Sequence, residues 1–516
     1  MNEVPQMDSI PVVLQQTAAR VSHRPAIIWG AGPEQEVISY AELAVTVERV
    51  AAGLARLGVE AGDRVALLLP NCPQFVYAWM AAARLGAMAV AMNPILAPEE
   101  VAYIVGDSGA KVLVGVERTA PLVLAMAERC NCVEHAVIAA EDVPEGAVDF
   151  RALVVEDTSG LPAPPDAEEV AALQYTSGTT GRPRGAMLTH ANLLSNARAS
   201  VEAVRMTEED VFLAVLPLFH IFGATVTMMI PIVMGAASAH LPRFEPLPTL
   251  EMIERAGVTI FCGVPSMFAV LAALKGAHGP DLSTLRLCIS GGAALPRDLT
   301  PIIEQRYDTT LLEGYGPTEA SPVISVNRTR ETRKIGSVGP PLPGVEVEIR
   351  DEQGQRMKTG EIGEICARGP NIMRGYWRDE EKTAAAVRDG WLSTGDLGHV
   401  DEDGYIYIVD RKTDMIIVGG LNVYPREVED VIRLLEPVRD VAVVGASSRL
   451  RGETVAAFIE LHEGGSLDER DVVEHCSEYL ARYKVPRRVR FIGDLPRSAT
   501  GKVLKRELRG RFGLRT

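Results

Sequence analysis

The spacing of apolar residues changes several times along the first 170 residues. Residues 40–54 and 75–86 carry apolar side chains at helical intervals, whereas residues 64–69 and 89–92 are short, largely apolar runs. Runs of this kind are typical of buried strands, and the longer periodic segments are typical of helices. Because strands that alternate with helices build parallel sheets with helices on their faces, the pattern predicts an α/β fold.

A second pattern begins near residue 336. Residues 336–410 are rich in Gly and Pro and contain short alternating segments, which predicts a small β subdomain. Residues 430–516 return to alternating helices and strands, which predicts a compact α+β module. A chain of 516 residues is too long for a single hydrophobic core, so we expect two or more domains.

The densest chemical signal is the run of residues 175–185, Tyr-Thr-Ser-Gly-Thr-Thr-Gly-Arg-Pro-Arg-Gly. Apolar residues on both sides predict two short strands joined by this loop. Glycines allow several backbone N–H groups to face one point, and hydroxyls and arginines add donors, so the loop suits a nucleotide triphosphate. It is not a Walker A loop, because the fifth residue after Gly178 is Pro183. An ordinary Gly/Ser/Thr turn is the alternative. Thr189, which follows the loop, is predicted to be the N-cap of a helix.

Three later segments, residues 258–265, 285–292 and 310–319, are also predicted to be strands that end in glycine-rich turns. Each could be a plain turn between a strand and a helix. Together, and after the loop at 175–185, they predict a nucleotide site at the carboxyl ends of a parallel sheet.

The net charge indicates which partners to expect, and the cysteine content indicates the cellular compartment. The net charge of −16 argues against nucleic acid or an anionic membrane surface as the main partner. Seven scattered cysteines indicate reduced thiols, and hence a cytoplasmic protein. The uncharged stretch at 211–241 is broken by Pro and Gly, so we expect buried helices lining a cavity and no integral membrane segment.

Several of these motifs together resemble the adenylate-forming enzymes, which include acyl-CoA synthetases, peptide-synthetase adenylation domains and luciferases. The resemblance runs from about residue 10 to 510 and is greatest to bacterial medium- and long-chain fatty acyl-CoA synthetases. It is carried by residues 175–185, 310–319, 391–396, 410–429 and 495–505. The family usually has Lys where this chain has Arg182 and Arg184. Arginine keeps the charge but binds phosphate as a fork.

The resemblance implies a role for each matching residue. Lys502, Thr176, Glu319 and His220 would be catalytic, and Glu319 and Thr176 would bind Mg²⁺. The ATP or AMP site would contain Thr176, Ser177, Gly178, Thr179, Thr180, Gly181, Arg182, Arg184, Gly292, Ala293, Glu313, Gly314, Tyr315, Gly316, Thr318, Asp396, Arg411 and Lys502. The acyl pocket would contain His220, Ile221, Phe222, Gly223, Val264 and Gly291, with the small Gly223 leaving depth for the substrate. His220 would position the substrate and gate the pocket rather than act as a base.

The resemblance also implies a large N-terminal domain at 1–411, with two α/β-sheet subdomains and a small β-barrel-like subdomain at about 336–410. A mobile α+β lid would follow at 412–516. Thr413 would be the hinge, where the family usually has Asp or Lys, and Gly419 and Gly420 would approach the pantetheine of coenzyme A. The basic residues Arg487, Arg488, Arg490, Lys505 and Arg506 could face the CoA phosphates or simply be surface.

The function implied is an ATP-dependent carboxylic acid:CoA ligase with Mg²⁺ as cofactor. It would form an acyl-adenylate and pyrophosphate, then acyl-CoA and AMP. The apolar, Met-rich residues 221–230 suit an alkyl or aryl tail. The resemblance of residues 410–417 to bacterial medium- and long-chain fatty acyl-CoA synthetases favours a medium- or long-chain fatty acid. An aryl acid such as a cinnamate or benzoate, a luciferase-like oxygenase and a non-catalytic nucleotide- or acyl-binding protein are the alternatives. Oligomeric state is left open, with a homodimer as one option.

Overall fold

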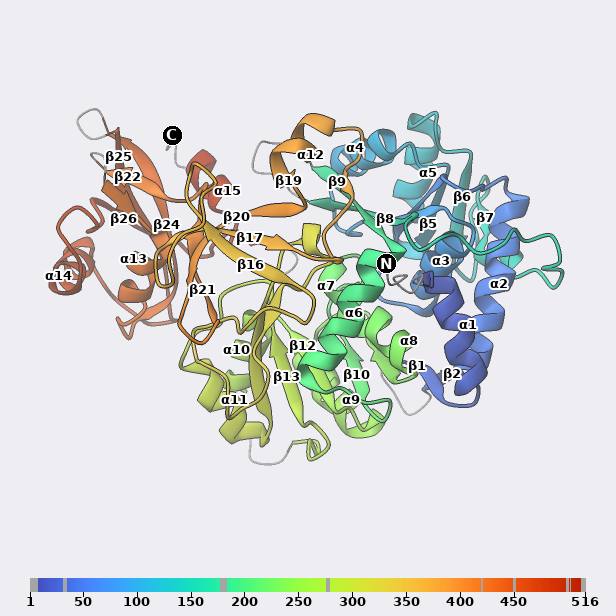
Figure 1. The fold of residues 1–516 in the computed structure, drawn as a ribbon, viewed down its shortest axis with the longest axis horizontal. Helices are drawn as coiled ribbons and strands as arrows, with labels where there is room; N and C mark the ends of the chain where they lie inside the picture. Colours follow the sequence, from blue (N-terminus) through green and yellow to red (C-terminus); the bar gives the residue numbers. More distant parts are fainter. Residues whose placement is uncertain are drawn as a thin grey trace, which may run out of the picture. The chain divides into compact units, whose positions relative to one another are not determined.

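The structure is a computed structural model that describes residues 8–30, 35–176, 183–274, 279–418, 421–448, 452–497, 501 and 503–511. The chain divides into two compact units, shown in sequence colours in Figure 1. The first comprises residues 1–346 and 367–392, and the second comprises residues 347–366 and 393–516. The predicted division at residue 411 stays a prediction.

One sheet of the first unit is built from the predicted early strands and the hairpin at 175–185. Its eight described strands run in the order β18-β9-β8-β4-β3-β5-β6-β7. The pairs β3–β4, β3–β5 and β5–β6 are parallel, whereas β8 and β9 are antiparallel. The bounds are β3 Arg64–Leu68, β4 Met88–Ala91, β5 Val112–Val116, β6 His135–Ala139, β7 Val148–Asp149, β8 Val170–Thr176, β9 Arg184–Thr189 and β18 Gly375–Tyr376.

A second sheet in the same unit also has eight described strands, in the order β15-β14-β13-β12-β10-β11-β1-β2. The run from β1 to β14 is parallel, as expected for strands separated by helices. The bounds are β1 Pro25–Trp29, β2 Glu36–Ser39, β10 Val211–Ala214, β11 Ala237–His240, β12 Ile260–Gly263, β13 Leu287–Ser290, β14 Thr310–Tyr315 and β15 Ser325–Val326.

Helices pack against these sheets, and most of them bury apolar residues there, α3 on nearly all sides, whereas α12 buries none. Figure 1 shows α4 and α5 beside β5, and α6 beside α8. Thr189 caps α6 by accepting a hydrogen bond from Asn192 N, which confirms the predicted N-cap. The bounds are α1 Ile10–Arg20, α2 Tyr40–Arg56, α3 Pro73–Arg84, α4 Pro98–Ser108, α5 Ala120–Arg129, α6 His190–Val204, α9 Pro246–Ala256, α10 Pro265–Ala273, α11 Leu299–Tyr307 and α12 Glu380–Ala386.

The long uncharged stretch is a set of short buried elements. After β10 come α7 (Ile221–Ala224), a π-helical turn (Thr225–Met229) and α8 (Ile230–Met234), and then β11. Almost every side chain from 221 to 232 is buried within the first unit. Across the described parts of the chain, every helix falls short of the length and apolar character that crossing a bilayer requires.

The second unit holds most of a small, largely antiparallel sheet and all of a separate C-terminal sheet. The small sheet has the order β16-β17-β20-β19, with β21 on β20. The C-terminal sheet has the order β23-β22-β25-β24, with β26 on β25, and helices α13, α14 and α15 accompany it. The bounds are β16 Glu346–Arg350, β17 Gly363–Arg368, β19 Val387–Arg388, β20 Trp391–Val400, β21 Ile406–Arg411, β22 Ile416–Val418, β23 Leu421–Val423, β24 Val438–Ser448, β25 Gly452–Leu461, β26 Arg488–Phe491, α13 Pro425–Ile432, α14 Glu469–Tyr479 and α15 Lys505–Arg511.

The predicted fold class is confirmed: two α/β sheets, a small β part and an α+β C-terminal part are all present. The expected mobility of the C-terminal part stays a prediction.

Candidate active site

The predicted hairpin exists, and its base is fixed on both sides. Strands β8 and β9 pair from Val170↔Thr189 to Thr176↔Arg184. The Tyr175 hydroxyl donates to Asp107 Oδ2 at 2.5 Å, and a Cβ at Gly185 would lie 3.3 Å from the Tyr175 ring. A side chain at position 185 would therefore press on the Tyr175 ring. The residues of the loop itself and some other predicted site residues lie outside the described residues: Ser177, Gly178, Thr179, Thr180, Gly181, Arg182, Gly419, Gly420 and Lys502.

A segment far along the chain completes this edge of the sheet. Strand β18 pairs with β9 through Gly375↔Met187 and Tyr376↔Ala186, and Trp377 N donates to Gly185 O at 2.8 Å. This register brings Tyr376 to Arg184, whose guanidinium carbon lies 5.6 Å from the centre of the Tyr376 ring.

Glu319, which lies in the turn after β14, also contacts Tyr376. The Tyr376 hydroxyl donates to Glu319 Oε1 at 2.8 Å, and Met373 N donates to Glu319 O at 2.8 Å. Burial raises the pKa of Tyr376, and the charge of Glu319 raises it further. The structure therefore brings the predicted phosphate residue Arg184 and the predicted metal ligand Glu319 to one tyrosine. Thr176 faces Arg184 across the hairpin.

The loop that carries Glu319 is held by amides and by close backbone packing. Asn371 Nδ2 donates to Ala320 O at 2.9 Å, and Asn196 Nδ2 donates to Val323 O at 2.7 Å. A Cβ at Gly316 would lie 1.9 Å from Pro322 O, so this position requires glycine. Thr318 opens the short 3₁₀ turn Thr318–Ala320 and is half-buried, as is Tyr315 at the end of β14.

The three glycine-ended strands lie side by side, as predicted. Parallel pairing sets Gly263 beside Ser290 and Ser290 beside Glu313. A Cβ at Gly291 would lie 3.0 Å from the Phe222 ring and 3.6 Å from Gly314 O. At Gly292, where φ is +78°, a Cβ would lie 3.6 Å from Val264 Cγ1.

The remaining predicted pocket residues flank this group. Ile221 is buried, whereas Ala293 is exposed. His220 is the N-cap of α7, and its Nδ1 accepts a hydrogen bond from Phe222 N at 3.2 Å. This contact fixes the start of the helix, and the positioning and gating role of His220 stays a prediction.

One interpretation from the sequence needs correction, and one residue has a structural contact that the sequence did not show. Gly223 was expected to leave depth for the substrate, but a Cβ there would lie 2.3 Å from Pro217 O. The glycine serves a close approach of helix and loop, and backbone fills the space. Glu313, predicted to lie beside adenine, has a buried side chain that accepts a hydrogen bond from Leu295 N at 3.0 Å, and its contact with adenine stays a prediction. This hydrogen bond ties the loop after β13 to β14.

In the second unit, the predicted ribose residues Asp396 and Arg411 are neighbours. They face one another across β20 and β21, and Arg411 Nε lies 3.2 Å from Asp396 Oδ1. The predicted hinge residue Thr413 is exposed in the turn that follows, where Asp414 N donates to Arg411 O at 3.0 Å.

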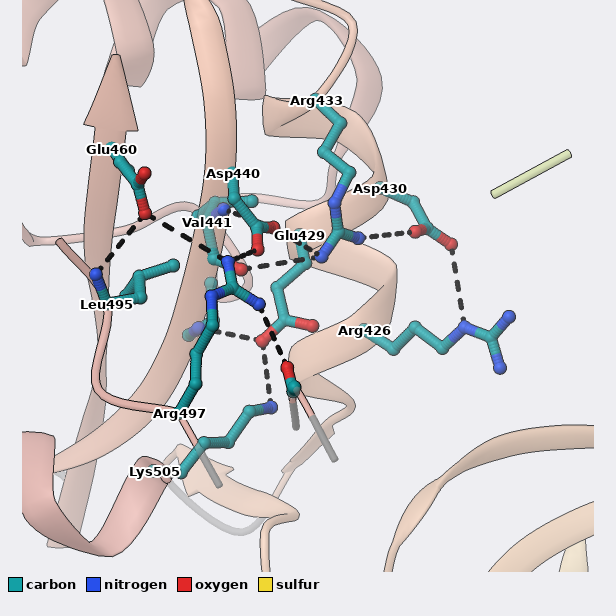
Figure 2. Close-up of polar contacts among 12 residues, drawn as sticks. Arg426, Glu429, Asp430, Arg433, Asp440, Val441, Glu460, Leu495, Arg497 and Lys505 are labelled. Carbon is teal, nitrogen blue, oxygen red and sulfur yellow. Dashed lines mark hydrogen bonds and ion pairs between the residues drawn. The ribbon is translucent and has the colours of Figure 1, made fainter. Parts of the chain in front are cut away.

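The terminal motif around residue 502 is held at both ends by charge pairs (Figure 2). On one side, Arg497 pairs with Asp440 and donates to Gly501 O at 3.1 Å. On the other, Lys505 Nζ lies 2.8 Å from Glu429 Oε1. Burial alone would lower the pKa of Lys505, but the charge of Glu429 and of nearby Asp410 raises it overall.

Lys505 was considered as a contact for CoA phosphates, and its pairing with Glu429 places it inside the unit instead. Arg487 and Arg488 are exposed and line a surface hollow of about 660 Å³ together with three hydroxyl side chains, those of Ser447, Ser448 and Thr454. This combination of guanidinium groups and hydroxyls suits a phosphate group.

Sequence reasoning missed Tyr376, Asn196 and Asn371. All three act through residues that are distant in the sequence, so no local pattern exposes them. The one available signal was Tyr376 within Arg374-Gly-Tyr-Trp377, where an aromatic pair follows a glycine.

Comparison with known proteins fits this geometry. The family model described as AMP-binding enzyme matches residues 14–377, and the model described as AMP-binding enzyme C-terminal domain matches residues 427–502. The chain is 35% identical to a long-chain-fatty-acid–CoA ligase of Bacillus subtilis (strain 168), over 96% of this chain and 93% of the relative. It is 37% identical to a feruloyl-CoA synthase of Amycolatopsis sp., over 92% of this chain and 94% of the relative.

Among solved structures, the chain is similar to ATP-bound MatB from Rhodopseudomonas palustris, with 33% identity and a TM-score of 0.90 over 98% of this chain and 99% of that one. The chain therefore belongs to the AMP-binding enzyme family of adenylate-forming enzymes, and it is of the AMP-forming acid–CoA ligase class within that family.

Proposed function

We propose that the enzyme activates an apolar carboxylic acid, most simply a medium- or long-chain fatty acid, with ATP and Mg²⁺ and then transfers the acyl group to coenzyme A. The observation that carries the proposal is the meeting of Arg184, Tyr376 and Glu319 at the base of the β8–β9 hairpin. A cationic side chain and a carboxylate set side by side suit a phosphate chain and the cation that accompanies it.

ATP would lie along the carboxyl ends of β12, β13 and β14. Thr176, Arg184 and the loop residues 177–182 would hold its β- and γ-phosphates. Tyr315 and Gly314 would face the adenine, and Thr318 would approach the α-phosphate. Asp396 would bind the ribose hydroxyls, since a carboxylate offers two acceptor oxygens, and Arg411 would add a charge.

The residues present suit Mg²⁺. Glu319 is half-buried, it is a hard oxygen ligand, and its side chain accepts a hydrogen bond from a neutral hydroxyl, that of Tyr376. Glu319 would hold the metal, with Thr176 as a second contact. Bound there, Mg²⁺ would neutralise phosphate charge.

The first step needs no protein nucleophile. The substrate carboxylate attacks the α-phosphorus, a new O–P bond forms, and the bond to pyrophosphate breaks. Negative charge grows on phosphate oxygens, so positioning and nearby cations are what the protein must supply. Lys502 of the terminal motif would neutralise the carboxylate and the α-phosphate, and Arg182 and Arg184 the leaving pyrophosphate. In the second step the CoA thiolate attacks the acyl carbon and AMP leaves.

The acid would enter beside Phe222 and Gly291, with His220 at the mouth. The segment from Ile221 to Met229 is apolar and mostly buried, which favours an uncharged tail. An aryl acid of the cinnamate or benzoate kind is the second candidate, because the feruloyl-CoA synthase relative is as similar as the fatty-acid ligase.

Arg487 and Arg488 would contact the CoA phosphates, and Gly419 and Gly420 would contact the pantetheine arm.

A pyrophosphate-release assay with a panel of acids tests the proposal. The panel holds saturated acids of graded length, cinnamate, ferulate and benzoate, each with and without CoA. The expected result is release that depends on an apolar acid, with acyl-CoA formed only when CoA is present. Preference for the aryl acids would favour the second candidate, and no release with any acid would favour a binding protein.

Replacing Lys502 separates the two half-reactions. Lys502→Ala is expected to lower adenylate formation by about a hundredfold or more, the loss seen when one transition-state contact is removed. Thioester formation from supplied acyl-adenylate should remain. Equal loss of both half-reactions would contradict the role given to Lys502.

A further inference from the structure

We propose that Tyr376 is a positioning residue for the metal: its hydroxyl holds one oxygen of Glu319 so that the other faces Mg²⁺. The inference rests on the proposed function, because it takes Glu319 as the metal ligand. It goes beyond that function because neither the sequence motifs nor the nucleotide site itself assigns a role to Tyr376.

The contact between the two side chains is specific to one oxygen. Tyr376 donates to Glu319 Oε1 at 2.8 Å, and Oε2 accepts no hydrogen bond from the described residues. A glutamate side chain has several rotatable bonds, and fixing them costs conformational entropy. A donor that is already in place removes part of that cost before the metal arrives, which is the basis of preorganisation.

A neutral donor is the right kind of partner for this task. An Arg or Lys at the same distance would fix the carboxylate equally well, but it would also repel the incoming cation. A hydroxyl leaves the net charge of Glu319 unchanged. Among the described residues, Arg184 brings a cation beside the tyrosine: its guanidinium carbon lies 5.6 Å from the centre of the ring, and its charge lowers the pKa of Tyr376 against the larger rise caused by burial and Glu319.

The position of the tyrosine is itself set by backbone contacts. Tyr376 pairs with Ala186 across β9, and its N–H donates to Thr383 Oγ1 at 2.8 Å. At the preceding Gly375, where φ is +149°, a Cβ would lie 2.6 Å from Thr383 Cγ2. The segment therefore has little freedom to withdraw the hydroxyl from Glu319.

The Glu319 backbone is held independently. Met373 N donates to Glu319 O at 2.8 Å, and Asn371 Nδ2 donates to Ala320 O at 2.9 Å. Removing the tyrosine hydroxyl would therefore release the carboxylate without releasing the turn. This separation makes a single-atom test meaningful.

The test is Tyr376→Phe in the full chain, which keeps the ring beside Arg184 and deletes the hydroxyl. Isothermal titration calorimetry would measure the dissociation constant of ATP with Mg²⁺ and with EDTA in place of metal. The ratio of the two constants is the metal enhancement. In the variant we expect this ratio to fall about tenfold, which corresponds to about 1.4 kcal/mol, while metal-free binding stays at the wild-type value.

A matched control variant and a double variant test whether the lost metal enhancement arises through the Glu319 carboxylate. Tyr175→Phe removes a hydroxyl that donates to Asp107 at the base of the same hairpin, and its metal enhancement should match wild type. Glu319→Gln should abolish most of the enhancement, and adding Tyr376→Phe to it should cost nothing more, since both act through one carboxylate. EPR spectra of Mn²⁺ bound with ATP should broaden in Tyr376→Phe, because the ligand is less ordered.

The outcomes separate the two proposals. If Glu319→Gln leaves the enhancement intact, Glu319 is not the metal ligand, and the proposed metal site and this inference both fail. If Glu319→Gln abolishes it and Tyr376→Phe does not change it, only the role of Tyr376 is overturned. An equal loss of metal-free ATP binding in Tyr376→Phe would also overturn that role, because the hydroxyl would then act on the nucleotide or on the fold.

Discussion

The Glu319 turn of the first unit and the terminal motif of the second are both fixed in place, but by opposite chemistry. Around Glu319 the donors are uncharged: a tyrosine hydroxyl, two asparagine amides and a backbone N–H. Around the terminal motif the contacts are charge pairs, between Arg497 and Asp440 and between Lys505 and Glu429. Each carboxylate of the second group already has its counter-ion.

The proposed function accounts for the difference between the two groups of carboxylates. A buried carboxylate without a cation is costly, so Glu429 and Glu460, both nearly inaccessible, are paired with Lys505 and Arg439. Glu319 is only half-buried, and its side chain accepts a hydrogen bond from a neutral hydroxyl. A residue that is to bind a cation must be oriented without being neutralised, and neutral donors achieve this.

The two regions also differ in whether the atoms at their closest contacts can move aside. Near Glu319 the closest approaches are between backbone atoms, as at Gly316 and Pro322. In the C-terminal sheet the corresponding approach at Gly445 is to the end of the Glu453 side chain. We therefore expect the two regions to fail in different ways when mutated.

The largest effect is expected for Lys505→Met. It removes the direct ion-pair partner of the buried Glu429 and leaves the charge of Arg433 nearby, and breaking a buried pair in this way typically costs about 3–5 kcal/mol of folding free energy. Hydrogen exchange should show faster opening of β24 and α13 in the second unit, with the sheets of the first unit unchanged. Arg470→Met is the control, because the pair of Arg470 with Glu474 is exposed and should contribute little. Equal protection in both variants would show that the charge pairs do not hold this region.

The next effect contrasts two glycines. Gly316→Ala places a Cβ 1.9 Å from Pro322 O, a backbone atom that cannot move aside, and overpacking of this kind costs about 2 kcal/mol. Gly445→Ala meets Glu453 Oε1 at 2.3 Å, and this side chain can rotate at less cost. Urea unfolding monitored unit by unit should rank Gly316→Ala as the more harmful. If the ranking were reversed, the proposed difference between rigid and compliant packing would be wrong.

Much of the candidate site could be predicted because its residues are local in sequence. The hairpin at 175–185, the N-cap at Thr189 and the three adjacent strands with glycine ends follow from turn chemistry and alternation. In each case one short segment carries the whole signal. Family resemblance then assigned roles that local physics could not.

What could not be predicted depends on how segments pack against one another. Tyr376 and Glu319 are 57 positions apart in the sequence, and Asn371 and Ala320 are 51 positions apart. Gly223 looked like space for a substrate, yet its size is set by Pro217 on the preceding loop. A small residue has the same appearance in a sequence whether it borders a cavity or another backbone, so only the fold distinguishes the two.

The smallest expected effect is a loss of stability at low pH, and it depends on a buried histidine of the first unit. His190, at the start of α6, is fully buried, and its Nδ1 accepts a hydrogen bond from Ile10 N at 3.3 Å. Burial lowers the pKa of His190 to about 4. Between pH 6.5 and 4 the unfolded chain takes up a proton that the folded chain refuses, so stability falls as the pH falls.

At pH 5.5 this amounts to about 1.4 kcal/mol for one histidine, relative to pH 7.5. His190→Gln retains an acceptor for Ile10 N and cannot be protonated, so its unfolding free energy should change less with pH by about that amount. His23→Gln, at an exposed site, should follow the wild-type profile. His240, also buried with its pKa lowered to about 4, should keep a residual acid sensitivity in His190→Gln. If the first unit of His190→Gln lost stability as steeply as wild type over this range, uncharged burial of His190 would not be the source of the acid sensitivity.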